Sequence, residues 1–98
     1  MPAYVIAEIE VTDAALYDDY RRQVAATVTA HGGRFLVRGG AITWLEGTPA
    51  PQRQVVLEFA GMAQLQAWYQ SPEYAPLIAL RQRASSGRLV AVEGLPPA

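Results

Sequence analysis

The order in which apolar patterns change along this chain constrains its fold more than any other feature of the sequence. Four short segments have the alternating or continuous apolar pattern of half-buried strands. Two longer segments place apolar residues on one arc at helical spacing. The order predicted from these patterns is strand, helix, strand, strand, helical segment, strand.

The predicted strands are short apolar runs bounded by turn-forming residues. They cover Tyr4–Val11, Arg34–Arg38, Arg53–Phe59 and Arg88–Glu93. Gly39-Gly40 is expected to bend or bulge the chain, after which Ala41–Leu45 resumes an extended course. The proline-rich stretch at 48–52 is short enough to be a hairpin loop.

The first helix is predicted to begin after Thr12 or Asp13, whose side chains accept hydrogen bonds from free backbone N–H groups. It runs to about His31, and Gly32 supplies the left-handed residue that ends it. The residues on its apolar stripe are Leu16, Tyr17, Tyr20, Val24, Val28 and His31. His31 is interpreted as a partner of the last helical carbonyls, with an acid/base or metal role as the weaker alternative.

The second helical segment covers Met62–Gln70 and restarts at Ser71-Pro72 with Ser71 as its N-cap. Pro76 follows closely, so the restarted helix is expected to become regular only from there, and it ends near Ala84.

This element order predicts an α+β fold of the ferredoxin-like βαββαβ type. Four antiparallel strands form one sheet, and both helical segments cover one face. Right-handed crossovers place the first and third strands in the centre. Residues 1–98 form one domain, with 95–98 as a flexible tail.

The other face of this sheet is predicted to be too apolar for contact with water. Tyr4, Ile6, Val56 and one of the two rows of residues 89–92 stand on it. An exposed patch of that size on a small protein indicates a partner. The simplest partner is a second copy packed sheet against sheet, so we expect an obligate or near-obligate homodimer.

Composition excludes several kinds of site. There is no cysteine, which rules out disulfides, zinc–thiolate sites and iron–sulfur clusters, and His31 is the only histidine. We therefore expect no metal and no cofactor. All eight basic residues are arginines and the net charge is −1, so nucleic acid is not an expected partner. With neither a membrane span nor a signal peptide recognisable, we expect a cytoplasmic protein.

An arginine within an apolar helical stripe is the most informative candidate for function. Tyr74, Leu77, Arg81 and Ala84 follow at spacings of 3, 4 and 3 residues and share one face. A buried guanidinium needs a partner. Arg81 either reaches a carboxylate or carbonyls of its own chain, or it faces a pocket with the Tyr74 hydroxyl and holds an anionic or carbonyl ligand.

Glu58 is the second candidate, because it lies in the apolar run 55–59 of a central strand. Glu8 is on the other central strand, and both carboxylates should face the uncovered side of the sheet. Close together, they would raise one pKa and provide an acid or base. The alternative, which we favour, is a salt-bridge network across the dimer interface with Arg34, Arg38, Arg53 or Arg88.

The remaining candidates surround the glycine pair. Gly39-Gly40 is interpreted first as a structural kink of a hairpin, and alternatively as a kink that aims Arg38 and Trp44 into a pocket mouth. The aromatic residues of the helices are most simply core residues with a polar tip, and Tyr69 among them is a further candidate ligand contact.

Several of these segments together resemble a known family. They are 32–40 (Gly-Gly-Arg-Phe-Leu-Val-Arg-Gly-Gly), 46–47, 53–59, 68–74 with its Ser-Pro-Glu-Tyr, Arg81 and 93–94. The chain resembles the domain-of-unknown-function 1330 family over nearly its whole length. The resemblance implies a bacterial protein of the dimeric α+β barrel superfamily, in which two such sheets pair, and it implies no established reaction.

Two functions remain open. The first is a binding module for a small anionic or carbonyl-bearing organic molecule, held in a cleft between sheet and helices by Arg38, Trp44, Tyr69, Tyr74 and Arg81. The second is a cofactor-independent enzyme of the monooxygenase or isomerase kind. There Glu58 or Tyr74 would transfer a proton, and Arg81 and Arg38 would bind an oxyanion.

Overall fold

The computed structural model describes residues 1–48 and 52–97, and its elements follow the predicted order. They are β1 (Ala3–Val11), α1 (Ala14–Ala30), β2 (Arg34–Arg38), β3 (Arg53–Phe59), α2 (Met62–Tyr69), α3 (Ala75–Ala84) and β4 (Ser85–Glu93). The strands form one antiparallel sheet in the order β2-β3-β1-β4. The predicted α+β, ferredoxin-like fold with β1 and β3 in the centre is confirmed. The predicted loop at 48–52 and the predicted tail at 95–98 fall partly on residues 49–51 and 98, outside the described residues.

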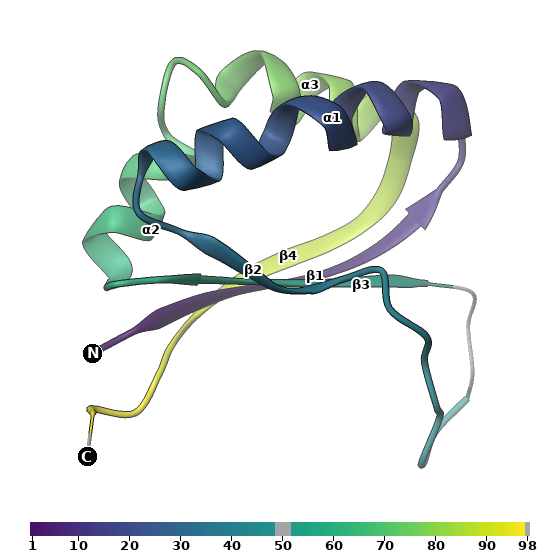
Figure 1. Ribbon diagram of the computed structural model, residues 1–98. Helices are drawn as coiled ribbons and strands as arrows, with labels where there is room; N and C mark the ends of the chain where they lie inside the picture. Colours follow the sequence, from purple (N-terminus) through teal and green to yellow (C-terminus); the bar gives the residue numbers. More distant parts are fainter. Residues whose placement is uncertain (49–51, 98) are drawn as a thin grey trace.

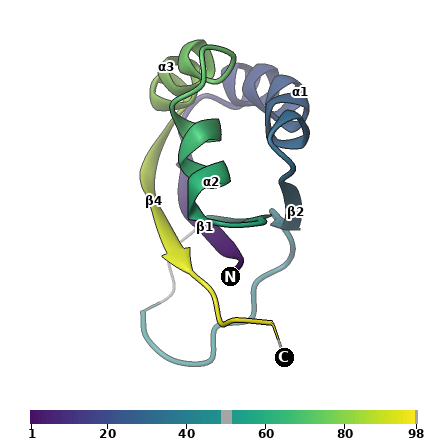
Figure 2. The same ribbon diagram turned by 90° about the vertical axis from the view of Figure 1, so that its left-hand side faces the viewer.

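The molecule has two layers, with the described helices on one face of the sheet (Figure 1). Figure 2 shows α1 and α3 side by side above the sheet, with α2 closer to it. The chain that leaves β2 runs out on the opposite, open side. Within residues 1–48 and 52–97, no helix has the length and apolarity needed to cross a membrane.

The core lies between the layers, because alternate residues of the central strands point toward the helices. In β1 the inward row is Ala3, Val5, Ala7 and Ile9, and each of these residues is almost fully buried. From the helical side, Tyr20, Val24, Val28, Leu65 and Trp68 pack against this row. The predicted apolar stripe of the first helix is therefore the face that covers the sheet.

Local hydrogen bonds explain where α1 begins and ends. Asp13 Oδ1 accepts from the backbone N–H of Leu16 at 3.1 Å, so Asp13 and not Thr12 is the N-cap. Gly32 follows the helix with φ of 73°, in the left-handed region, as predicted. His31 Nδ1 lies 3.0 Å from the Thr27 carbonyl oxygen, which confirms its interpretation as a partner of the last helical carbonyls.

The predicted restart of a helix at Ser71-Pro72 is wrong. Residues 72–74 form a turn, and α3 begins only at Ala75 with Pro76 in its first turn. Ser71 Oγ accepts from the backbone N–H of Tyr74 at 3.2 Å, so the serine caps this turn instead of a helix. The expectation that the helix becomes regular near Pro76 is confirmed.

β4 begins three residues earlier than predicted, directly after α3. Ser85-Ser86-Gly87, which was expected to be a loop, pairs with the end of β1, where Ser85 stands opposite Val11. A Cβ on Gly87 would lie 2.0 Å from the Glu8 carbonyl oxygen. Glycine allows this close approach of backbones, and the ladder therefore continues through a sequence that resembles a turn.

The expected second extended piece, Ala41–Leu45, is not a strand. The backbone N–H of Gly39 still donates to the Gln54 carbonyl at 2.9 Å. Gln54 is the second residue of β3, so only Arg53 remains beyond it and the strand offers no partner to Ala41–Leu45. Ile42, Trp44 and Leu45 are 38%, 41% and 89% exposed.

Candidate functional site

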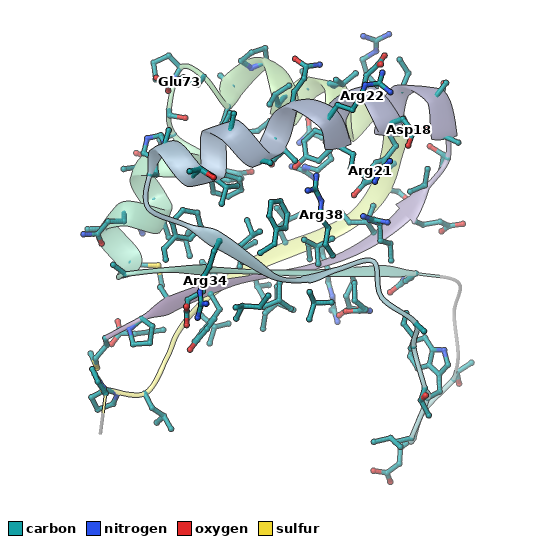
Figure 3. The ribbon with its side chains drawn as sticks, in the orientation of Figure 1. Asp18, Arg21, Arg22, Arg34, Arg38 and Glu73 are labelled. Atoms are coloured by element: carbon teal, nitrogen blue, oxygen red, sulfur yellow. The ribbon has the colours of Figure 1, made fainter. Side chains whose placement is uncertain are left out.

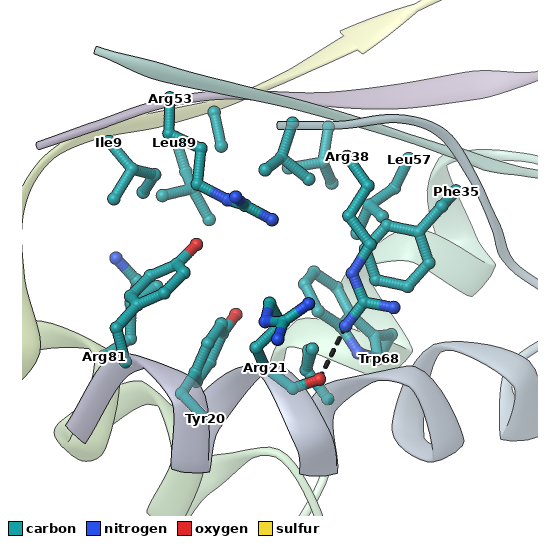
Figure 4. Close-up of a pocket in the computed structure, with 15 residues that line it drawn as sticks. Ile9, Tyr20, Arg21, Phe35, Arg38, Arg53, Leu57, Trp68, Arg81 and Leu89 are labelled. Atoms are coloured by element: carbon teal, nitrogen blue, oxygen red, sulfur yellow. Dashed lines mark hydrogen bonds between the residues drawn. The ribbon is translucent and has the colours of Figure 1, made fainter. Parts of the chain in front are cut away.

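A cavity between the inner face of the sheet and the helices gathers four arginines, Arg21, Arg38, Arg53 and Arg81 (Figure 4). We call it the arginine cavity. No aspartate or glutamate is among the described residues that line it. Within the same described set, only Arg21 forms an ion pair, with Asp18 on the same helix at 3.6 Å. The cavity therefore holds an excess of positive charge.

The rest of the cavity wall is apolar and aromatic. It includes Tyr20 and Trp68 on the helical side, and Phe35 and Leu57 on the sheet. The enclosed space is about 30 Å³, enough for one or two water molecules. Long arginine side chains fill much of the space between the layers, so a ligand larger than a few atoms requires them to move.

Arg38 reaches the cavity because of a bulge in β2. Arg34 pairs with Glu58 and Phe35 with Leu57, but the register then shifts, and Val37 pairs with Val56. The extra residue of β2, between Phe35 and Val37, reverses the face of the sheet to which each following side chain points. Figure 3 shows the result: Arg34 points to the open side of the sheet, and Arg38 points up toward α1. The sequence predicted a bend or bulge at Gly39-Gly40, whereas the structure has the irregularity between Phe35 and Val37.

Contacts of Arg38 span the mouth of the cavity between β2 and α1. Its Nη2 donates to the Arg21 carbonyl oxygen at 2.5 Å, and its Cζ lies 4.2 Å from the centre of the Phe35 ring. Partial burial, followed by the nearby charges of Arg21 and Arg53, lowers the pKa of Arg38 below its usual value. Each of these influences disfavours the charged form of the Arg38 guanidinium.

Arg53 enters from the first position of β3, opposite Ile9 of β1. Its Cζ lies 5.5 Å from the Tyr17 ring centre, within the range of a cation–π contact. Its Nε is buried and has no hydrogen-bond partner among the described residues. A Cβ on Gly39 would lie 2.2 Å from Nη1 of this arginine, so the glycine leaves room for the guanidinium.

Arg81 enters from α3 and is 8% exposed. Its Nε is also buried without a hydrogen-bond partner in the described chain. The sequence had left open whether a carboxylate or carbonyls of the same chain satisfy Arg81. Among the described residues, neither a carboxylate nor a carbonyl accepts a hydrogen bond from Arg81 Nε.

Tyr74 lies behind the cavity wall and not on it. It is fully buried, its ring stacks on Trp68 with centroids 4.2 Å apart, and its hydroxyl is 2.8 Å from that of Tyr20. Burial raises the pKa of both tyrosine hydroxyls, although the charge of Arg81 opposes this. Both stay protonated at neutral pH, and only Tyr20 faces the cavity.

The two candidate carboxylates are neither in the cavity nor next to each other. Glu58 stands opposite Tyr4 on the open face, and its Oε1 accepts from Arg34 Nε at 2.8 Å. Glu8 stands four register positions away and pairs with Arg88 at 2.9 Å. Both ion pairs form within one chain, and the predicted close carboxylate pair does not exist. Glu58 faces away from a ligand held between sheet and helices.

Two further predicted contacts lie elsewhere. Trp44 is on the segment that follows β2 and does not line the arginine cavity. Tyr69 is 41% exposed and borders a separate groove between α2 and β4, together with Val90. Of the five predicted ligand contacts, the structure brings together Arg38 and Arg81, with Tyr74 one layer behind.

Sequence reasoning missed Arg53 and Arg21 as cavity residues. A signal existed for both. Arg53 has the same two-residue parity as the inward-facing Leu57 and Phe59. Arg21 follows Tyr17 by four positions on α1 and so borders the buried stripe.

The role of Gly39 in placing Arg53 leads to a matched pair of variants. Gly39 has φ of 70°, so Gly39→Ala should cost about 1 kcal/mol of stability and displace the Arg53 guanidinium. Gly40→Ala is the control, because a Cβ there has no neighbour within 4 Å. Urea denaturation of both variants should show the loss of stability only for Gly39→Ala. Equal stabilities would contradict this role.

Comparison with known proteins is consistent with this geometry. A family model described as "Domain of unknown function (DUF1330)" matches residues 2–95. No match was found among curated proteins.

The solved structures that resemble the chain include the following three. A protein of unknown function from Rhodopseudomonas palustris has a TM-score of 0.78 at 20% identity, covering 98% of this chain and 84% of its own. SnoaB, a cofactor-independent oxygenase from Streptomyces nogalater, has 0.66 at 12% identity, covering 98% and 95%. A dimeric protein of unknown function and ferredoxin-like fold from Bacteroides fragilis has 0.53 at 14% identity, covering 95% and 96%. At these identities the likeness shows the fold alone.

Proposed function

This chain belongs to the DUF1330 family, and we propose that it binds a small anionic organic molecule in the arginine cavity. The observation that carries the proposal is the charge imbalance of the cavity. Four arginines line it without an acidic residue, and two of them have a buried Nε with no hydrogen-bond partner among the described residues. A buried guanidinium N–H without a hydrogen-bond partner is costly in an apolar site, and an anionic ligand removes that cost.

The aromatic wall supports an organic ligand over a simple inorganic ion. Tyr20, Phe35 and Trp68 offer ring faces and edges beside the guanidinium groups. Small-molecule sites commonly combine such apolar surface with a few placed polar groups. Arg38 is exposed at the mouth, so its outward rotation is a direct way to enlarge the space of about 30 Å³.

The test is stabilisation by an anion that depends on Arg81. Benzoate at ten times its Kd should stabilise the protein by about 1.4 kcal/mol and raise Tm by about 5 °C or more, whereas the neutral benzamide should not. Arg81→Met should abolish this rise. Arg83→Met, which removes an exposed arginine of the same helix, should retain it. An equal response of both variants would show that benzoate acts on the overall charge and would refute the proposal.

An enzymatic function is the alternative, supported by the structural likeness to the cofactor-independent oxygenase SnoaB. The cavity arginines suit an oxyanion. Glu58 and Tyr74, the proton-transfer groups this alternative was built on, have no surface in the cavity, so we favour binding. A bound ligand recovered unchanged after incubation in air supports binding. Loss of the ligand that requires Arg81 supports the enzyme.

We also propose that the protein is a homodimer through its open sheet face. The register sets Val37, Val56, Ile6 and Val90 side by side across all four strands on that face. Ile6, Val37 and Val90 are 36%, 40% and 48% exposed. The neighbour from Bacteroides fragilis, described as dimeric with a ferredoxin-like fold, supports a second copy as the cover.

A further inference from the structure

We propose that the natural ligand carries two acidic groups, one bound by Arg53 and the other by Arg81. This inference rests on the proposed anion-binding function and adds the class of ligand. It starts from the two arginines whose Nε atoms are buried and lack a hydrogen-bond partner in the described chain.

These two guanidinium groups reach the cavity from opposite layers. Arg53 belongs to the first position of β3, and Arg81 to the last turn of α3. Figure 4 shows Arg53 extending from the sheet and Arg81 rising from the helical side. A compact anion on one of them leaves the other unpaired, whereas a molecule with two separated acidic groups satisfies both.

The surroundings hold each guanidinium in place. Arg53 lies against Gly39 on one side and near the Tyr17 ring on the other. Arg81 lies next to the hydrogen-bonded pair Tyr20 and Tyr74, where its charge lowers the pKa of both hydroxyls against the effect of burial. Neither guanidinium is therefore a freely moving surface group.

The other two arginines, Arg21 and Arg38, already have partners within the chain. Arg21 pairs with Asp18, and Arg38 donates to the Arg21 carbonyl and covers the Phe35 ring. Arg38 lies at the mouth and Arg21 at its rim. Two acidic groups therefore match the two guanidinium groups that retain an unmet donor.

The experiment compares ligands that differ by one carboxylate, using calorimetric titration at constant ionic strength. The pairs are glutarate with butyrate and isophthalate with benzoate, in which the two carboxylates of each diacid are well separated. Each dicarboxylate should bind wild-type protein at least about tenfold more tightly than its partner, since a charged hydrogen-bonded contact is added. Sulfate, a compact dianion, should bind no better than the monocarboxylates.

Variants assign each carboxylate to an arginine. Arg53→Gln should lower dicarboxylate affinity to the monocarboxylate level and leave monocarboxylate affinity, which depends on Arg81, nearly unchanged. Arg81→Gln should weaken the binding of both kinds of ligand. Arg83→Gln is the charge-matched control and should change neither. Arg53→Lys and Arg81→Lys retain the charge and lose the planar fork, so they should be intermediate and serve if a glutamine variant does not fold.

Each outcome separates the two proposals. Equal affinity for both members of a pair, or sulfate binding as tight as isophthalate, overturns the two-group ligand but not the anion site. Equal weakening by Arg83→Gln shows an effect of overall charge and overturns the assignment. If no carboxylate binds, the proposed anion-binding function is refuted as well.

Discussion

Val56→Arg should convert the protein from a homodimer into a monomer at micromolar concentration. Val56 lies in the apolar row of the open face, between Ile6 and Val37 in the register. In an interface with twofold symmetry, the substitution occurs on both copies within the same contact. An unpaired charge buried there costs several kcal/mol, which weakens the dimer by more than about a hundredfold.

The measurement is sedimentation equilibrium over a range of concentrations. The control is a variant with the same added charge on a helix instead of on the open sheet face. Gln82→Arg adds the same charge on an exposed position of α3, on the other side of the sheet, and should leave the dimer intact. A folded wild-type monomer at micromolar concentration, or a dimer that tolerates arginine at position 56, would contradict the proposed interface.

Trp68→Ala should remove about 3–5 kcal/mol from the free energy of unfolding, which is a large share of the stability of a small domain. Trp68 is 1% exposed, stacks on Tyr74 and lies 5.5 Å from the Phe59 ring centre. Its Nε1–H donates to Thr27 Oγ1 at 3.0 Å. Alanine leaves a large void in the middle of this aromatic cluster.

Urea denaturation of two control variants separates the contributions of the ring, the hydrogen bond and the burial to the stability lost in Trp68→Ala. Trp68→Phe keeps a ring but loses the hydrogen bond and some packing, so it should cost less than alanine does. Tyr69→Ala removes the next aromatic residue of α2, which is 41% exposed, and should cost much less. A loss below about 1.5 kcal/mol for Trp68→Ala would show that the void collapses and that the cluster is not a rigid wall of the cavity.

The prediction of the site was less complete than that of the fold, for identifiable reasons. Arg81 was found because a helical stripe is a local pattern, and a charged residue within it is visible from spacing alone. For Glu58 the sequence left two roles open, with an ion pair favoured over a catalytic carboxylate, and it predicted the open-face position correctly. The interpretation of Glu58 as a member of an ion pair is the one that its 2.8 Å contact with Arg34 supports.

Strand ends and loops were predicted least well, since they depend on pairing partners. Ser85-Ser86-Gly87 has the composition of a turn, yet it is a strand because β1 extends far enough to pair with it. Ala41–Leu45 has the composition of a strand, yet it is irregular because β3 has no residue left opposite it. In both cases the neighbouring strand decided the structure.

The sequence by itself determined the order of the elements, the α+β class, the central strands and the apolar open face. Each of these follows from periodicity within a segment and from general rules of connection. Only the tertiary structure decided which arginines meet. The bulge between Phe35 and Val37 turns Arg38 inward, and a one-residue irregularity inverts every side chain that follows it. Arg53 and Arg81 line the same cavity only when sheet and helices pack, because a cavity between two layers is a property of both layers and not of either segment.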